Sequence, residues 1–117
     1  MLQEIKRVDK PWGCELIFAK TDRYCGKIIV VRKDQSLSLQ YHNTKEETMY
    51  MLSGNIMFTK DDSEFNVYPG QAVHIAPGTK HKVYAIEDST IFEVSTSEID
   101  DVVRLKDQYG REGTTAP

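Results

Sequence analysis

The chain has 117 residues, 28% of them charged, and a formal net charge of −3. This length is typical of one domain that buries roughly two-thirds of its unfolded surface without disulfide bonds. The mildly acidic balance excludes the basic surface of a nucleic-acid-binding protein, and no run of about 20 apolar residues is present to cross a bilayer. Because residues 1–10 are too charged for a signal peptide, we expect a cytoplasmic protein with no membrane partner.

The N-terminal segment predicts an extended chain. Pro11 cannot donate to a β-ladder, and it biases Lys10 away from the helical conformation. We therefore expect the run Lys10-Pro11-Trp12-Gly13 to lead into the first strand of the domain. Residues 2–8 form a further candidate strand, and its exposed edge is suited to pairing with a second copy, so we expect a homodimer.

The centre of the chain is typical of an all-β protein. Short runs rich in β-branched and aromatic residues alternate with turns built from Gly, Pro, Asn, Asp and Ser. The predicted strands are residues 14–19, 27–32, 36–42, 48–53, 55–60, 63–67, 72–75, 82–86 and 90–96. Strands at this spacing predict a sandwich or barrel with one cavity between two sheets. The barrel core is expected at about residues 12–97 of a single domain that spans residues 1–117.

The C-terminal tail, about residues 98–117, has a less regular pattern. Ser97 and Asp100 have the spacing of a helix N-terminus before the apolar residues Val102 and Val103, so we expect a short helical turn here. The residues that follow are expected to be coil. Cys14 and Cys25 lack CxxC spacing, which favours reduced, packed cysteines over a catalytic thiolate or a cross-strand disulfide.

Four polar residues have the spacing of a metal centre. Gln40 and His42 are two residues apart, so on a strand their side chains leave by the same face, and Glu47 returns to that face from the next strand. His81 follows the Pro77-Gly78 turn. An amide oxygen, two imidazoles and a carboxylate suit a divalent metal of borderline hardness, with zinc favoured and manganese, iron, cobalt or nickel as alternatives.

Two segments, residues 26–54 and 70–81, resemble the two signature motifs of the cupin superfamily. Cupins are small metal-binding proteins that fold as a double-stranded β-helix (jelly-roll) barrel. The likeness is closer to one branch, the type II mannose-6-phosphate isomerase cupin domain. The residues that carry it are Lys10-Pro11-Trp12-Gly13, Ser36-Leu37-Ser38-Leu39-Gln40-Tyr41-His42, Leu52-Ser53-Gly54, Asp100-Asp101-Val102-Val103-Arg104 and Asp107-Gln108-Tyr109-Gly110-Arg111. The similarity therefore runs through nearly the whole chain in order.

The resemblance implies a metal-dependent isomerase that interconverts an aldose phosphate and a ketose phosphate through an enediol. Gln40, His42, Glu47 and His81 fall on the metal-ligand positions of the family. The sequence departs from the family around those ligands, because Thr44 stands where a second histidine is usual, and Thr48 and Met49 replace a His-Trp pair.

Substrate binding and proton transfer need further residues. A guanidinium fork matches phosphate oxygens, so Arg111 is the first candidate for binding a sugar phosphate, followed by Lys45 and Arg104. The candidate proton carriers are Lys82, Tyr50 and His74.

Two other functions fit the same fold. One is a metal-dependent cupin that acts on a different small molecule, such as an oxygenase, because a fold does not fix a function. Gln40 disfavours an oxygenase, whose iron site usually contains more imidazole. The other is a sugar-binding cupin without catalysis, which a closed, metal-free pocket would support.

Overall fold

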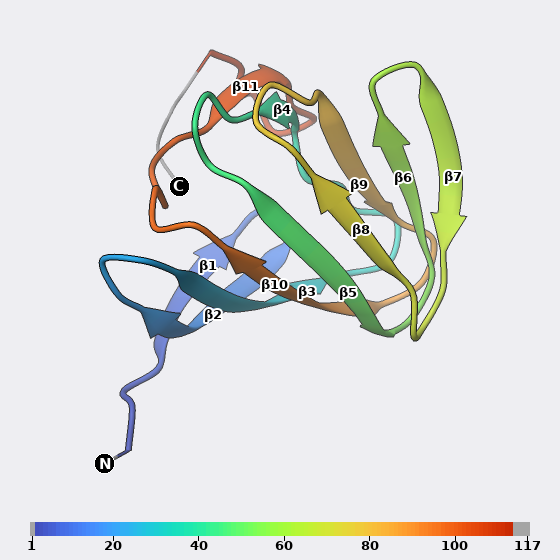
Figure 1. The fold of residues 1–117 in the computed structure, drawn as a ribbon. Coiled ribbons are helices and arrows are strands. Elements are labelled where there is room, and N and C mark those ends of the chain that lie inside the picture. The colour runs from blue at the N-terminus through green and yellow to red at the C-terminus, as the bar shows by residue number, and fades with distance from the viewer. Residues whose placement is uncertain (1, 114–117) are drawn as a thin grey trace.

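A computed structural model describes residues 2–113 and shows an all-β fold with no helix in that range (Figure 1). The strands are β1 (Lys6–Lys10), β2 (Gly13–Lys20), β3 (Cys25–Val31), β4 (Leu39–Tyr41), β5 (Glu47–Ser53), β6 (Ile56–Lys60), β7 (Ser63–Val67), β8 (Ala72–Ile75), β9 (His81–Ala85), β10 (Ser89–Ser95) and β11 (Val103–Lys106). Strands β2 to β10 coincide with the nine predicted runs, within the usual uncertainty of strand ends.

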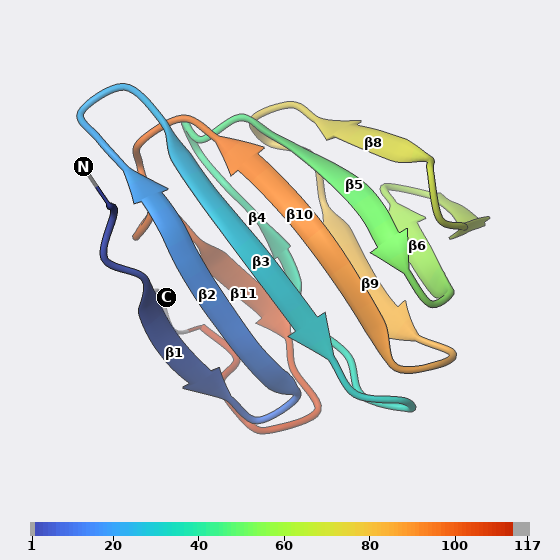
Figure 2. The ribbon, with the colours of Figure 1, turned by 90° about the horizontal axis from the view of Figure 1, so that it is seen from below.

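The strands form two antiparallel sheets that face each other, as Figure 2 shows from below. The first sheet has the order β1-β2-β3-β10-β5-β8 and the second has the order β11-β4-β9-β6-β7. Several neighbours, such as β3 with β10 and β4 with β9, are far apart in the sequence. This winding between two sheets is the double-stranded β-helix that the sequence predicted.

The core lies between the two sheets, because each strand places every second side chain there. Along β3, Ile29 and Val31 are buried, while their neighbours Ile28 and Val30 are only partly covered. Apolar residues of this kind fill the far half of the barrel, where the largest buried side chains include Phe58, Met51, Ile56, Ile75, Ile91 and Val83. The half closer to β1, β4 and β11 contains the charged residues described below.

The structure corrects two predictions at the ends of the domain. Residues 103–106 form a strand, β11, and not the expected helical turn, because Val103 and Arg104 pair with Tyr41 and Gln40 of β4. At the other end, β1 starts at Lys6 and pairs with β2 of the same chain, so the run Lys10-Pro11-Trp12-Gly13 is the turn of a hairpin. Both strands lie outside the predicted barrel core of residues 12–97.

Other expectations concern the surface and the cysteines. Among the described residues β1 is the end strand of its sheet, where a partner strand could add, and the homodimer stays a prediction. Cys14 and Cys25 are both buried and unpaired, as predicted. No helix long and apolar enough to cross a membrane occurs among the described residues. Residues 114–117 of the predicted coil tail lie outside the described part of the chain.

Candidate functional site

Two histidines and one glutamate converge on a single buried point between the sheets. His42 directly follows β4, Glu47 begins β5 and His81 begins β9. Their ligand atoms all lie within 4.8 Å of one another, and all three residues are buried. The Pro77-Gly78 turn brings His81 to this point, because the Gly78 N–H donates to the His42 carbonyl at 2.7 Å.

The hydrogen bonds of the two imidazoles leave a nitrogen lone pair on each ring aimed at this point. Nδ1 of His42 contacts the carbonyl oxygen of Asp101, and Nδ1 of His81 contacts that of Thr79 at 2.9 Å. A carbonyl only accepts, so each Nδ1 must be the donor, and in a neutral ring Nε2 is then an acceptor. Backbone carbonyls on the far ring nitrogen orient metal-binding histidines in the same way.

Both Nε2 atoms face the same carboxylate oxygen. Glu47 Oε1 lies 3.0 Å from His42 Nε2 and 3.2 Å from His81 Nε2, and among the described residues His81 Nε2 makes no hydrogen bond. Three acceptors this close repel one another unless a cation, either a proton or a metal ion, lies among them. The donor set is therefore suited to a divalent metal.

Lys45 orients the carboxylate from its other side. Its Nζ lies 3.2 Å from Glu47 Oε2 and 3.3 Å from Glu93 Oε2, in a group whose side chains are almost fully buried. Burial disfavours the charged form of Glu47. With a proton among the three acceptors, hydrogen bonds with His42 and His81, together with the charge of Lys45, outweigh burial and hold the pKa of Glu47 well below the usual range. Burial and the charge of Glu47 raise the pKa of Glu93 to about 8. Lys45 thus leaves Oε1 directed at the histidines.

Asp101 supports the loop that carries His42. Its carboxylate accepts backbone hydrogen bonds from Asn43, Thr44 and Lys45, at 3.0, 2.6 and 2.9 Å. Burial opposes ionisation, yet these three donors lower the pKa of Asp101 to about 2. Thr44, which stands where the family has a histidine, is exposed and contributes its backbone to this loop.

Gln40 lies on the same side of β4 as His42, in agreement with their spacing of two residues. It pairs in register with His81 on β9, and it lines the cavity next to the three ligands. Its side-chain oxygen accepts a hydrogen bond from Ser38 Oγ at 3.3 Å. The structure therefore brings together the four residues that the sequence predicted as ligands.

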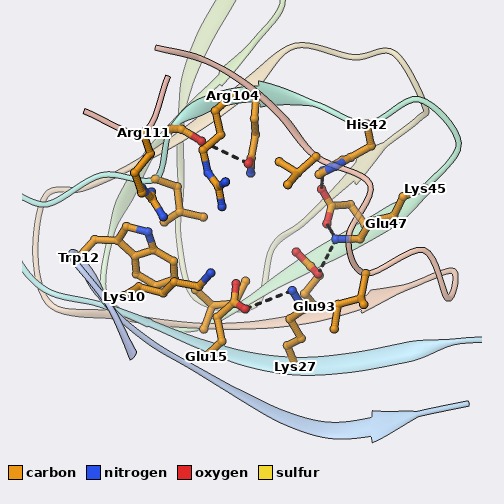
Figure 3. A pocket seen from close by; sticks show the side chains of 16 residues that line it. Lys10, Trp12, Glu15, Lys27, His42, Lys45, Glu47, Glu93, Arg104 and Arg111 are labelled. Carbon is orange, nitrogen blue, oxygen red and sulfur yellow. Dashed lines mark hydrogen bonds and ion pairs between the residues drawn. The ribbon is translucent and has the colours of Figure 1, made fainter. Parts of the chain in front are cut away.

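A cavity of about 40 Å³ extends from this group toward β1 and β11 (Figure 3). Its walls carry Lys10, Trp12, Glu15, Lys27, Ile29, Leu37, Ser38, Gln40, His42, Lys45, Glu47, Glu93, Ile99, Val102, Arg104 and Arg111. A single water needs roughly 10–15 Å³ on this measure, so the free space holds only a few waters.

The end of the cavity opposite the histidines is cationic. Lys10, Arg104 and Arg111 point into it together with the indole of Trp12 (Figure 3). Burial lowers the pKa of Lys10, and the charges of Arg104, Lys27 and Arg111 add to that shift. Burial and Arg111 likewise lower the pKa of Arg104. The arrangement concentrates positive charge where an anionic group could be bound.

A second buried ion pair lies between the two ends. Lys27 Nζ contacts Glu15 Oε1 at 3.2 Å, and the two side chains are 6% and 10% exposed. The charge of Lys27 also acts against the rise in the pKa of Glu93. Polar groups therefore lie at both ends of the cavity and between them.

The structure separates the other sequence candidates. Arg104 and Arg111 line the cationic end of the cavity. Lys45 lines the opposite end, where it contacts Glu47 and Glu93. The three proposed proton carriers, Lys82, Tyr50 and His74, do not line it.

Each of those three alternates along its strand with buried residues and faces away from the cavity. Lys82 follows the buried His81, Tyr50 stands between Met49 and Met51, and the exposed His74 pairs with Glu46 on the outer surface. Their placement does not support a role in proton transfer, because a base has to reach the reacting carbon.

Sequence reasoning missed several residues of the cavity, and a signal for two of them was present. Lys27 is in phase with the buried Ile29 and Val31 on β3, and Glu93 is in phase with Ile91 on β10. A charged residue in phase with the apolar face of a strand is expected to point inward. The run Lys10-Pro11-Trp12-Gly13 was recognised as part of the family resemblance, but its position in a hairpin turn beside the cavity was not predicted.

Residues 1–107 match a family described as "Mannose-6-phosphate isomerase C-terminal". The chain is 28% identical over 115 residues to a mannose-1-phosphate guanylyltransferase of Escherichia coli, with coverage of 91% of this chain and 24% of that protein. It is 30% identical over 109 residues to the alginate biosynthesis protein AlgA of Pseudomonas aeruginosa, with coverage of 89% and 23%. The chain thus spans about a quarter of the length of the curated relatives it matches.

Solved structures with the same fold include KdgF from Halomonas sp., with a TM-score of 0.74, 18% identity and coverage of 81% of this chain and 90% of that one. An RmlC-like cupin from Shewanella frigidimarina has a TM-score of 0.72, 10% identity and coverage of 84% and 86%. A Bacillus subtilis oxalate decarboxylase with Mn(II) centres has a TM-score of 0.74, 18% identity and coverage of 86% and 30%. These similarities confirm the predicted cupin fold.

Proposed function

Because the chain belongs to the mannose-6-phosphate isomerase C-terminal family of cupins, we propose that it is a metal-dependent enzyme that interconverts an aldose phosphate and a ketose phosphate. The observation that carries this proposal is the convergence of His42, Glu47 and His81 at one end of a cavity whose other end is cationic. Its named relatives include a guanylyltransferase about four times as long, so the activity is proposed for the cupin domain alone.

The metal would be held by Nε2 of His42, Nε2 of His81 and Oε1 of Glu47, with Gln40 as the fourth ligand. Both histidines already have the tautomer that a metal needs, and Lys45 keeps Glu47 Oε2 engaged so that Oε1 faces them. A divalent ion in this position supplies Lewis-acid polarisation of the substrate oxygens. The Mn(II) centres of the related oxalate decarboxylase support a divalent ion, and the mixed nitrogen and oxygen ligands suit zinc equally well.

The phosphate group of the substrate would lie at the end formed by Arg111 and Arg104. Isomerisation also needs a group that moves a proton between adjacent carbons. Glu93 and Glu15 are the carboxylates of the cavity wall that the proposed ligand set does not use. We assign proton transfer to one of them in place of Lys82, Tyr50 and His74, which face away from the cavity.

The test combines metal content with turnover. Purified protein should contain about one divalent ion per chain, as expected for a single ligand group, and it should convert mannose 6-phosphate to fructose 6-phosphate. Chelation should abolish the conversion, and restoring the metal should recover it. A folded, fully metallated sample without turnover would reject the isomerase and leave the metal centre intact.

The chain contains three histidines, which provides a matched control. His42→Ala and His81→Ala should lose the bound metal because each removes a convergent ligand atom. His74→Ala should keep it, because His74 lies on the outer surface. Equal metal content in all three variants would refute the ligand assignment whether or not the protein is an isomerase.

A further inference from the structure

Residues 107–113, which we call the C-terminal strap, lie along the cationic end of the cavity. The Gly113 N–H donates to the Arg104 carbonyl at 2.7 Å, so the strap folds back on β11. Tyr109 Oη donates to Gln35, and Ser36 Oγ donates to Gln108 at 2.5 Å. Three separate contacts therefore hold this irregular segment against the barrel.

Within the strap, Asp107 binds Arg111 through three hydrogen bonds. Its Oδ2 accepts from the Arg111 backbone N–H at 2.8 Å and from Nε at 2.9 Å, and its Oδ1 accepts from Nη2 at 3.1 Å. The Asp107 side chain is fully buried, whereas that of Arg111 is 23% exposed. A two-point contact between carboxylate and guanidinium fixes the plane of the guanidinium as well as its position.

This fixed guanidinium belongs to the cavity wall. Figure 3 shows Arg111 beside Trp12 and across from Lys10, with Arg104 next to it. The cations Lys10, Arg104 and Arg111 therefore gather at this end of the cavity, and Lys27 lies in the wall next to them. A cluster of positive charges this close together attracts an anion.

We propose that Asp107 is a positioning residue for substrate specificity, which holds Arg111 so that Arg111, Arg104 and Lys10 bind a dianionic phosphate group at the end of the cavity opposite the metal ligands. The inference rests on the proposed function for the identity of the anion, a phosphate ester. The positioning role itself follows from the geometry of the strap.

The direction in which Asp107→Asn changes phosphate affinity distinguishes a positioning role from a purely electrostatic one. Asp107→Asn removes a negative charge near the binding site, so charge alone predicts tighter binding of an anion. Loss of the two-point contact instead frees the long Arg111 side chain, which must then be ordered again on binding. Immobilising such a side chain costs enough to weaken affinity between about twofold and tenfold. A weaker affinity therefore reports position, since the electrostatic change acts in the opposite direction.

Inorganic phosphate is the probe, titrated into the full, metal-loaded chain and followed by calorimetry and by the fluorescence of Trp12, the single tryptophan. Asp107→Asn should weaken phosphate binding by the factor given above, and Arg111→Ala should weaken it at least tenfold. In the Arg111→Ala background Asp107→Asn should have no further effect, because it acts through Arg111. Arg111→Lys keeps the charge but cannot form the two-point contact, so it should also weaken binding.

Arg23→Ala, at an exposed arginine of the β2–β3 turn, is the matched control and should bind phosphate like the unaltered protein. Unchanged or tighter binding in Asp107→Asn would overturn the inference, as would additive effects in the double variant. Loss of phosphate binding on chelation would place the phosphate at the metal and would also overturn it. Because the titration needs no turnover, absence of isomerisation would reject the proposed function without touching this result.

Discussion

Replacing Lys27 with methionine would leave the Glu15 carboxylate in the cavity wall without its principal partner. The two charged atoms are 3.2 Å apart and both side chains are nearly buried, so solvent screens the pair only weakly. With an effective dielectric constant of about 20, Coulomb attraction at this distance is about 5 kcal/mol. Lys10 also interacts with Glu15 and recovers part of that energy. We therefore expect Lys27→Met to lower the free energy of unfolding by about 3 kcal/mol.

The reverse substitution is expected to be milder. Glu15→Gln keeps a side-chain oxygen that can accept a hydrogen bond from Lys27, so we expect a loss of about 2 kcal/mol. The double variant removes both charges and should lose about 2 kcal/mol, which gives a coupling energy of about 3 kcal/mol. Urea unfolding followed by Trp12 fluorescence measures all three, because the indole is buried in the folded chain. Additive single losses would refute the view that this pair is a strongly coupled, poorly screened interaction.

Two further predictions concern the backbone and pH. Gly54→Ala should destabilise the fold by about 2 kcal/mol or more, because φ is +92° there and a Cβ would lie 2.3 Å from Ser89 Oγ. Gly70→Ala is the control, because φ is a similar +88° but the Cβ would meet no atom within 4 Å, and it should cost about 1 kcal/mol. Thermal unfolding measures both changes. Hydrogen bonds from Arg111 and its charge outweigh burial and lower the pKa of Asp107 in the folded chain. The contribution of Asp107 to the free energy of unfolding should therefore be complete above its unfolded pKa of about 4, and it should disappear as the pH falls through the folded pKa. The difference in urea midpoint between the unaltered protein and Asp107→Asn should accordingly shrink in acid, and a constant difference would contradict this origin.

The sequence predicted β2 to β10, placed a candidate strand at residues 2–8 that overlaps β1 only in part, and missed β11. Strand β1, Lys6–Lys10, is mostly exposed and charged, so it lacks the hydrophobic alternation by which a strand is recognised. In β11 the alternation is inverted, because Arg104 points inward while Leu105 is 38% exposed. A pattern that assumes apolar residues inside cannot identify such a strand, and the Ser97 spacing then favoured a helix.

The grouping of the candidate ligand residues was predictable because their spacing follows from strand geometry and from a turn. Gln40 and His42 share a face by periodicity alone, and the Pro77-Gly78 turn marks the start of β9. The proton carriers could not be predicted in the same way. Whether His74 or Lys82 points inward depends on the register of pairing, and a shift of one residue exchanges the two faces of a strand.

The charged residues of the cavity carry an energetic argument for function. Lys27 on β3 and Glu93 on β10 occupy positions that could hold apolar side chains. Ile29 and Ile91, two residues away on the same inward faces, are buried apolar residues. Replacing both members of a buried ion pair with well-packed apolar residues is often neutral or stabilising, although removing one member alone is costly, so the fold itself does not require the Lys27–Glu15 pair. A domain of this size has a net stability of only about 5–15 kcal/mol, which leaves little room for buried charges without a use. Their alignment with the candidate metal ligands at one end and Arg111 at the other supports the proposal that the cavity binds a charged, oxygen-rich molecule.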